Sequence, residues 1–219
     1  MQIDFLTDVF KEHRNAEAIV WKDRGYSYGW LLERLEHWQT EIRREGITAG
    51  TVSVIEGDFS PNSVALFLAL VGEGCIVVPL TPAMGAKKDE FIKIAQGQAL
   101  FEIDGNDDVT FSRLTNTPDH PFYEQMSEDG HPGLVVFSSG STGESKAAVH
   151  DLAGILKKFH VRRNCLRSIT FLLYDHLGGL NTMLYQLSNG GCIVTVNDRN
   201  PDKVLTAVER HKVELLPTS

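Results

Sequence analysis

Residues 134–146 read Leu-Val-Val-Phe-Ser-Ser-Gly-Ser-Thr-Gly-Glu-Ser-Lys, an apolar run that passes directly into small hydroxyl and glycine residues and ends on a lysine. The apolar part, Leu134 to Phe137, predicts a buried strand. Glycines let a backbone approach oxygen atoms closely, and N–H groups and hydroxyls hydrogen-bond to spread-out negative charge. Lys146 adds a point charge of the kind that binds phosphate. The stretch therefore predicts a strand followed by a loop that binds a polyphosphate.

Two other phosphate-binding loops do not fit this stretch. A Walker A loop needs Gly, four residues, and then Gly-Lys followed by Ser or Thr. Four residues after Gly140 the next position is Ser145, and Ala147 follows the lysine. A dinucleotide fingerprint is also excluded, because no Gly-x-Gly-x-x-Gly follows a predicted strand. The failed Walker spacing disfavours an unrelated nucleotide kinase.

The segments on either side of the loop alternate between strand-like and helix-like apolar periods. Before the loop we expect strands at 52–55, 76–80 and 99–103, helices at 29–45 and 89–96, and a helix opened by Ser60 and Pro61. Residues 104–108 predict a turn, and 115–133 a connecting segment. After the loop we expect strands at 147–149, 170–173, 193–196 and 213–216, helices at 151–159 and 180–187, and a last helix opened by Asn200 and Pro201. Strands separated by helices imply an α/β fold with largely parallel sheets covered by helices.

Composition narrows the function classes. The 219 residues are 42% hydrophobic and 23% charged, typical of a soluble globular protein, and no apolar stretch is long enough to span a membrane. The formal net charge is −8 and the basic residues are scattered, which argues against a nucleic-acid binder. The N-terminus has no signal-peptide pattern, and we expect a cytoplasmic protein. Cys75, Cys165 and Cys192 lack metal-ligand spacing, so we predict no metal site and place Cys75 and Cys192 in the core.

The loop resembles the signature of the AMP-forming, adenylate-forming enzymes, namely the acyl-CoA synthetases, peptide-synthetase adenylation domains and luciferases. Each position from Val135 to Lys146 fits that signature. Three further segments resemble this family in the right order: 26–31, 65–82 with its Val-Pro-Leu-x-Pro end, and 172–180, where a histidine precedes a glycine. The resemblance covers residues 16–219. Two departures are Glu144, where the family usually has Lys, and Ser145, where many members have Pro.

The resemblance implies an α/β fold with a layered αβαβ arrangement, as in the N-terminal domain of acyl-CoA synthetases. Residues 1–132 would form the first α/β subdomain, and residues 133–219 the phosphate loop and the start of the next subdomain. The rest of the N-terminal domain and the C-terminal domain would be absent from the chain. The final residues, Pro217-Thr218-Ser219, directly follow a predicted buried strand, which indicates a fragment. An uncovered final strand predicts self-association of that fragment.

By resemblance, the parent protein is an acid:thiol ligase that activates a carboxylic acid with ATP and Mg²⁺. The acyl-adenylate would then pass to coenzyme A or to the phosphopantetheine of an acyl carrier protein. The residues implied in phosphate binding are Ser138, Ser139, Gly140, Ser141, Thr142, Gly143 and Lys146. His176 would lie beside the α-phosphate and the acid, as a catalytic gate.

Other functional readings stay open. Because the remaining machinery of the family would lie beyond Ser219, we expect this polypeptide alone to be inactive. The alternative is a non-catalytic nucleotide-binding module derived from the same family, which Glu144 supports. The acid is undetermined. An amino-acid substrate would call for an aspartate that answers its ammonium group in the unseen part, so we favour a simple carboxylic acid.

Overall fold

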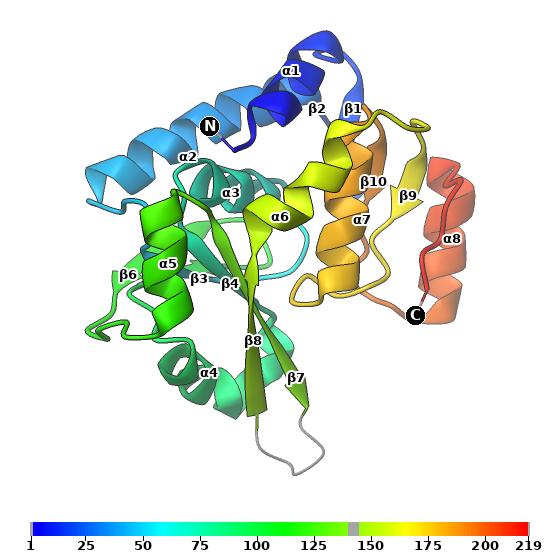
Figure 1. Ribbon diagram of the computed structural model, residues 1–219. Coiled ribbons are helices and arrows are strands. Elements are labelled where there is room, and N and C mark those ends of the chain that lie inside the picture. The colour runs from blue at the N-terminus through cyan, green and yellow to red at the C-terminus, as the bar shows by residue number, and fades with distance from the viewer. Residues whose placement is uncertain (1, 140–144, 219) are drawn as a thin grey trace.

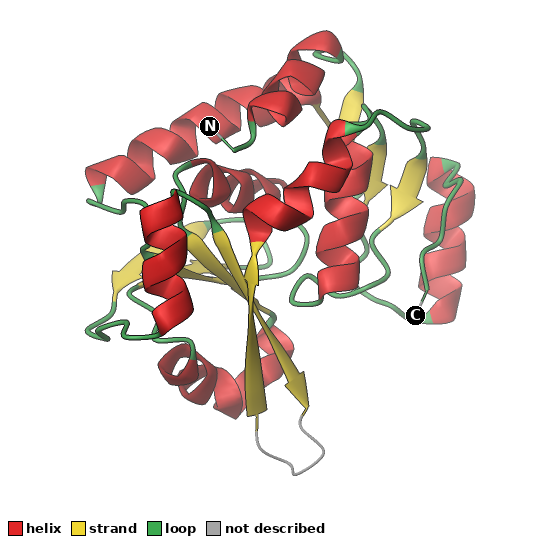
Figure 2. Ribbon diagram, in the orientation of Figure 1, coloured by secondary structure: helices red, strands yellow, loops and turns green. Residues whose placement is uncertain are grey.

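The computed structural model describes residues 2–139 and 145–218, and it builds two sheets with helices packed around them (Figures 1 and 2). The larger sheet has six strands in the order β6-β5-β3-β4-β7-β8. Their bounds are β3 Val52–Glu56, β4 Ile76–Leu80, β5 Ala99–Ile103, β6 Val109–Arg113, β7 Gly133–Ser139 and β8 Ser145–Asp151. The four central strands are parallel, and β6 and β8 pair antiparallel at the two edges.

The smaller sheet has four strands in the order β2-β1-β10-β9. They are β1 Glu17–Trp21, β2 Arg24–Ser27, β9 Arg167–Ile169 and β10 Cys192–Val194. β1, β10 and β9 run parallel, whereas β2 is antiparallel to β1. The larger sheet thus has an antiparallel strand at both edges and the smaller sheet at one edge. The predicted α/β fold with largely parallel, helix-covered sheets is confirmed.

The two sheets do not follow the order of the chain. β1, near the N-terminus, pairs with β10, which forms after residue 166, and β7 and β8 join the sheet that begins at residue 52. The predicted division into subdomains between residues 132 and 133 stays a prediction. Each sheet contains strands from before and from after this point in the sequence.

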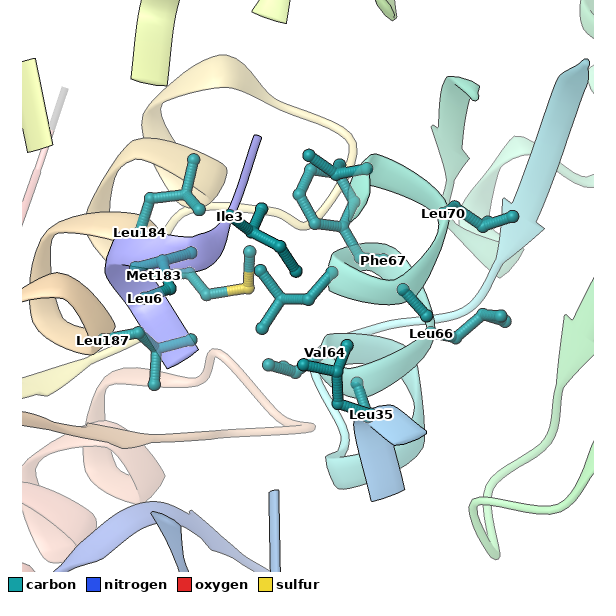
Figure 3. Packing of buried hydrophobic residues seen from close by; sticks show 14 of the residues in the cluster. Ile3, Leu6, Leu35, Val64, Leu66, Phe67, Leu70, Met183, Leu184 and Leu187 are labelled. Atoms are coloured by element: carbon teal, nitrogen blue, oxygen red, sulfur yellow. The ribbon is translucent and has the colours of Figure 1, made fainter. Parts of the chain in front are cut away.

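The helices pack on and between the sheets, with α3 at the centre. Their bounds are α1 Asp4–Glu12, α2 Tyr28–Arg44, α3 Pro61–Gly72, α4 Lys88–Ile94, α5 Pro121–Asp129, α6 Leu152–Leu156, α7 Leu177–Ser188 and α8 Pro201–His211, with 3₁₀ turns η1 Pro82–Lys87 and η2 Lys157–His160. The side chains of α3 are almost all buried. Figure 3 shows Val64 and Phe67 of α3 beside Met183 of α7 and Ile3 near the N-terminus, all in one apolar cluster. This cluster fixes α7, whose N-cap, His176, is one of the candidate residues.

Local signals placed several elements correctly. α3 opens as predicted, with Pro61 in its first turn and a reciprocal capping box between Ser60 and Ser63. Asn200 likewise caps α8 through the N–H of Asp202. Cys75 and Cys192 are buried as predicted, and burial raises the pKa of the Cys75 thiol to about 12 and that of Cys192 to about 11. Both thiols are therefore protonated core groups at neutral pH.

Three predictions about elements were wrong. The strand expected at 170–173 is instead β9, Arg167–Ile169, because after Thr170 the backbone turns away and the Phe171 carbonyl accepts a hydrogen bond from Arg199. The expected connecting segment 115–133 contains α5, and β6 precedes it. Residues 213–216 make only an isolated bridge, Leu215 to Ser168, so the buried final strand was wrong.

Leu215 and Leu216 are 37% and 43% exposed, and the predicted self-association stays a prediction. Among residues 2–139 and 145–218, no helix is both long and apolar enough to cross a membrane.

Candidate functional site

The β7–β8 hairpin brings the two ends of the serine- and glycine-rich stretch together. In its antiparallel ladder Ser138 lies directly opposite Lys146, and Ser139 opposite Ser145. Residues directly opposite in such a ladder have Cβ atoms about 4.5–5.5 Å apart and share one face. Ser138 and Lys146 are both exposed, so a hydroxyl and an ammonium face solvent side by side. Gly140, Ser141, Thr142 and Gly143 lie outside the described residues.

The loop end of the hairpin packs against α4. The ring of Phe137 stacks on Phe91 with centroids 4.2 Å apart and planes at 7°. α4 is tied to the sheet by Lys88, whose ammonium lies 2.5 Å from carboxylate oxygens of both Glu56 and Glu102. Burial acts to lower the pKa of Lys88, but its hydrogen bonds to the two carboxylates outweigh that effect, so the pKa is raised. The strands that carry Ser138 and Lys146 therefore stand on an anchored support.

His176 comes from the other sheet. It is the N-cap residue of α7, and its N–H donates to the Leu173 carbonyl at 3.2 Å. Its side chain is 60% exposed, and Nε2 lies 3.8 Å from Oδ1 of Asp175. Within the described part of the chain the contact of this imidazole is with Asp175, and no contact with the hairpin is found. The structure thus pairs Ser138 with Lys146 and holds His176 separately.

Asp175 is a buried carboxylate with one unsatisfied oxygen. The residue is only 5% exposed. Its Oδ2 accepts a hydrogen bond of 2.9 Å from the hydroxyl of Thr81, the residue that directly follows β4 of the larger sheet. Its Oδ1 is buried and has no hydrogen-bond partner among the described residues. Leaving a buried charged oxygen without a donor is costly, so this atom marks a place where a donor or a cation would be stabilised.

The turn before His176 is also held by α3 and by the loop between β3 and α3. The side chain of Tyr174 is fully buried, its hydroxyl donates to the Ser63 carbonyl at 3.2 Å, and its ring meets Phe59 edge-on at 5.1 Å. Burial raises the pKa of Tyr174 well above its ordinary value. Thr81 and Tyr174 together fix the position of His176 relative to the sheet that carries the hairpin.

Sequence reasoning missed these supporting residues. Thr81 was the unspecified position of the Val-Pro-Leu-x-Pro segment, a hydroxyl between two prolines, and that is the only local signal it offered. Phe91 lies inside the helix predicted at 89–96 and Lys88 just before it, but neither residue was predicted to support the loop. In residues 2–139 and 145–218 no group of three or more His, Cys, Asp or Glu side chains is arranged to hold a metal ion.

Comparison with known proteins settles the family. Residues 6–219 match the family described as AMP-binding enzyme. The chain belongs to this family. The predicted resemblance to adenylate-forming enzymes is thereby confirmed, and the fold is that of the N-terminal portion of their adenylation domains.

Individual relatives are distant. The chain is 27% identical over 220 residues to the hybrid PKS-NRPS synthetase 1 of Dothistroma septosporum, covering 90% of this chain and 6% of that protein. It is 23% identical to the 4-coumarate--CoA ligase-like 9 of Arabidopsis thaliana, covering 94% of this chain and 43% of the relative. Among solved structures it resembles NpsA-ThdA, an artificially fused adenylation-PCP di-domain NRPS from Klebsiella oxytoca, with a TM-score of 0.77 and 17% identity. The match covers 98% of this chain and 46% of that structure. At that identity the likeness shows the fold alone, and the chain spans less than half the length of these relatives.

Proposed function

We propose that this chain is the nucleotide-binding N-terminal portion of an ATP-dependent, AMP-forming acid:thiol ligase. A carboxylate would attack the α-phosphorus of ATP, releasing pyrophosphate and forming an acyl-adenylate, and a thiol would then displace AMP. The observation that carries the proposal is the cross-strand pair Ser138 and Lys146 at the mouth of a strand–loop–strand motif, in a chain of the AMP-binding family. In such chemistry the protein mainly positions the phosphates and stabilises their charge.

The described residues fit a polyphosphate. Ser138 offers a hydroxyl donor and Lys146 an ammonium on one exposed face. We assign the β- and γ-phosphates to Ser138, Lys146 and the residues between them, namely Ser139, Gly140, Ser141, Thr142 and Gly143. Mg²⁺, when bound, would offset phosphate charge, and no residue of this chain is assigned to it. His176 is assigned to the α-phosphate side of the site, where its exposed imidazole can hydrogen-bond.

The acceptor thiol belongs to coenzyme A or to the phosphopantetheine of a carrier protein. The name of the Arabidopsis relative supports coenzyme A, and the adenylation-PCP architecture of the Klebsiella structure supports a carrier protein. We favour the carrier protein as the acceptor, because the relatives include peptide synthetases such as bacitracin synthase 1 of Bacillus licheniformis.

One structural observation favours an amino acid as the acid, in contrast to the simple carboxylic acid favoured by sequence. Asp175 is a candidate for the aspartate that an ammonium group would require, which the sequence analysis expected in the unseen part. It is anchored by Thr81, and its buried Oδ1, 3.8 Å from Nε2 of His176, has no hydrogen-bond partner among the described residues. An ammonium group at that oxygen would supply the missing partner. Asp175→Asn should therefore weaken binding of an amino acid and not that of the matched acid without its amino group, as followed by NMR titration in the presence of MgATP.

The main test is calorimetry of the 219-residue chain with MgATP and with inorganic triphosphate. Lys146→Ala should weaken both by about tenfold, the worth of one charge-assisted contact of about 1.4 kcal/mol. The matched control is Lys157→Ala, an exposed lysine of η2 outside the hairpin, which should leave both affinities unchanged. If Lys146→Ala binds MgATP and triphosphate as tightly as the unmodified chain does, Lys146 does not bind the phosphates and the assignment of the phosphate site fails.

A further inference from the structure

A cavity of about 400 Å³ lies between the two sheets and outside the residues assigned above. Its walls follow the carboxyl ends of β1, β3, β4, β5 and β10, and Ser138, Lys146 and His176 are not among its lining residues. In the larger sheet β3 lies between β4, the next strand along the chain, and β5, the one after, so the strand order reverses at this point. Ligands of open α/β sheets bind outside the carboxyl ends of strands at such reversals.

Apolar and aromatic side chains form much of the cavity wall. Phe59 and Ile103, 2% and 7% exposed, form its inner wall together with Leu173, and the indole of Trp21 closes one side. Ligand pockets for small molecules typically have volumes of about 300–1,000 Å³ and apolar or aromatic walls with a few polar groups. The cavity suits a flat apolar group of modest size.

Among the charged residues that line the cavity, Asp104 has no ion pair within the described part of the chain. Arg199 is fully engaged, with a two-point pair to Asp58 at 2.8 and 3.0 Å and a hydrogen bond to the Phe171 carbonyl. Lys22, outside the cavity, donates to the Gly105 carbonyl and lies 4.5 Å above the Trp21 ring. Asp104 lines the rim, exposed, and its Oδ1 accepts two backbone N–H bonds of its own turn. The rim therefore favours a cation over an anion.

We propose that this cavity binds a small molecule with a flat apolar body and one ammonium group. The apolar body lies between Trp21 and Phe59, and the ammonium group pairs with Asp104 at the rim. This site is distinct from Asp175, which is hydrogen-bonded to the wall residue Thr81 but does not itself line the cavity.

The cavity is connected to the proposed catalytic turn through two of its wall residues. The hydroxyl of Thr81 holds Asp175, and the carbonyl of Leu173 accepts the N–H of His176. An occupant that contacts Thr81 and Leu173 shares these anchors with His176. Occupancy of the cavity is thereby linked to the placement of the imidazole.

The test is an NMR titration of the ¹⁵N-labelled chain with tryptamine, indole-3-propionate and the uncharged 3-methylindole. Tryptamine should shift the amide signals of Gly105, Leu173 and Asn197 and bind about tenfold more tightly than indole-3-propionate, because only the charge differs in sign at the Asp104 rim. Equal affinity of the two charged probes, or shifts confined to other parts of the chain, would overturn the proposal.

Substitutions at Gly105 and Asp104 test separately how the shape and the charge of the rim contribute to ligand binding. A Cβ added at Gly105 meets no atom within 4 Å, and the residue does not need a left-handed backbone, so side chains are accepted there. Gly105→Leu should fill the cavity and abolish the tryptamine shifts, whereas Gly105→Ala, its matched control, should retain them. Asp104→Asn keeps an oxygen for the turn and should weaken tryptamine by about fivefold while 3-methylindole binds unchanged. Retained tryptamine binding in Gly105→Leu, with an otherwise native spectrum, would place the ligand elsewhere.

Discussion

The β7–β8 hairpin and the turn between β9 and α7 carry the candidate residues of the two sheets, and they are held in different ways. The hairpin is fixed by its backbone, through seven successive cross-strand pairs from Gly133 and Asp151 to Ser139 and Ser145. The turn has no ladder and is fixed by side chains, the buried Tyr174 and Asp175 with their bonds to Ser63 and Thr81. Backbone pairing tolerates substitution of its exposed side chains, whereas side-chain anchors do not. Substitutions of the anchoring side chains in the turn should therefore lower the free energy of unfolding more than substitutions of exposed side chains in the hairpin.

The largest effect is expected at Tyr174. Tyr174→Ala removes a fully buried ring that packs against Phe59 and Phe67, so it should lower the free energy of unfolding by about 3–5 kcal/mol in urea denaturation. Tyr174→Phe keeps the ring and loses only the hydrogen bond to Ser63, which should cost about 1 kcal/mol. A loss below 1 kcal/mol for Tyr174→Ala would mean that the turn is not held by this ring.

The next effect is expected at Thr81. Thr81→Val keeps the shape of a residue that is 3% exposed but removes the donor to Oδ2 of Asp175, so unfolding should become easier by about 1–3 kcal/mol. Thr81→Ser retains the hydroxyl and is the matched control. In a double-mutant cycle with Asp175→Asn, the two losses should be non-additive. Simple additivity would show that the hydroxyl and the carboxylate do not support one another.

A smaller effect is expected where α4 supports the hairpin, through the stacked rings of Phe91 and Phe137. Phe91→Leu removes the stack on Phe137 and should cost about 1 kcal/mol, with faster amide exchange in β7 and β8. Phe122→Leu is the control, because Phe122 lies on α5 and is 57% exposed. If both substitutions have the same effect, the hairpin stands on its ladder alone.

The same contrast explains how far the sequence could predict the molecule. Ser138 and Lys146 lie close along the chain on either side of a turn-forming stretch, so their pairing is a local consequence of a hairpin. The opening of α3 is equally local, since Ser60 and Pro61 supply the cap and the first turn. Thr81 and Asp175, by contrast, are 94 residues apart, and no pattern in either segment indicates their hydrogen bond.

Errors in the predicted elements have the same origin. Residues 170–173 have the composition of a strand, but the carbonyl of Phe171 accepts a hydrogen bond from Arg199, which lies 28 residues further on and pairs with Asp58 in the loop after β3. α5 was missed because its limits, Pro121 and the left-handed Gly130, fall in a polar stretch that reads as a loop. In both places tertiary contacts and end signals outweighed average composition.

The smallest effect on stability is expected at Lys146. This variant best tests the contrast between the hairpin, held by backbone pairing, and the turn, held by side chains. The side chain is exposed and its ladder partners are backbone groups, so Lys146→Ala should change the free energy of unfolding by no more than about 0.5 kcal/mol. The proposed loss of MgATP affinity would then occur in a chain as stable as the original, which separates a binding role from a structural one. Ser138→Ala, at the opposite position of the ladder, should behave in the same way. A loss of stability at either position comparable to that of Thr81→Val would show that these side chains support the hairpin, and the division between backbone-held and side-chain-held regions would fail.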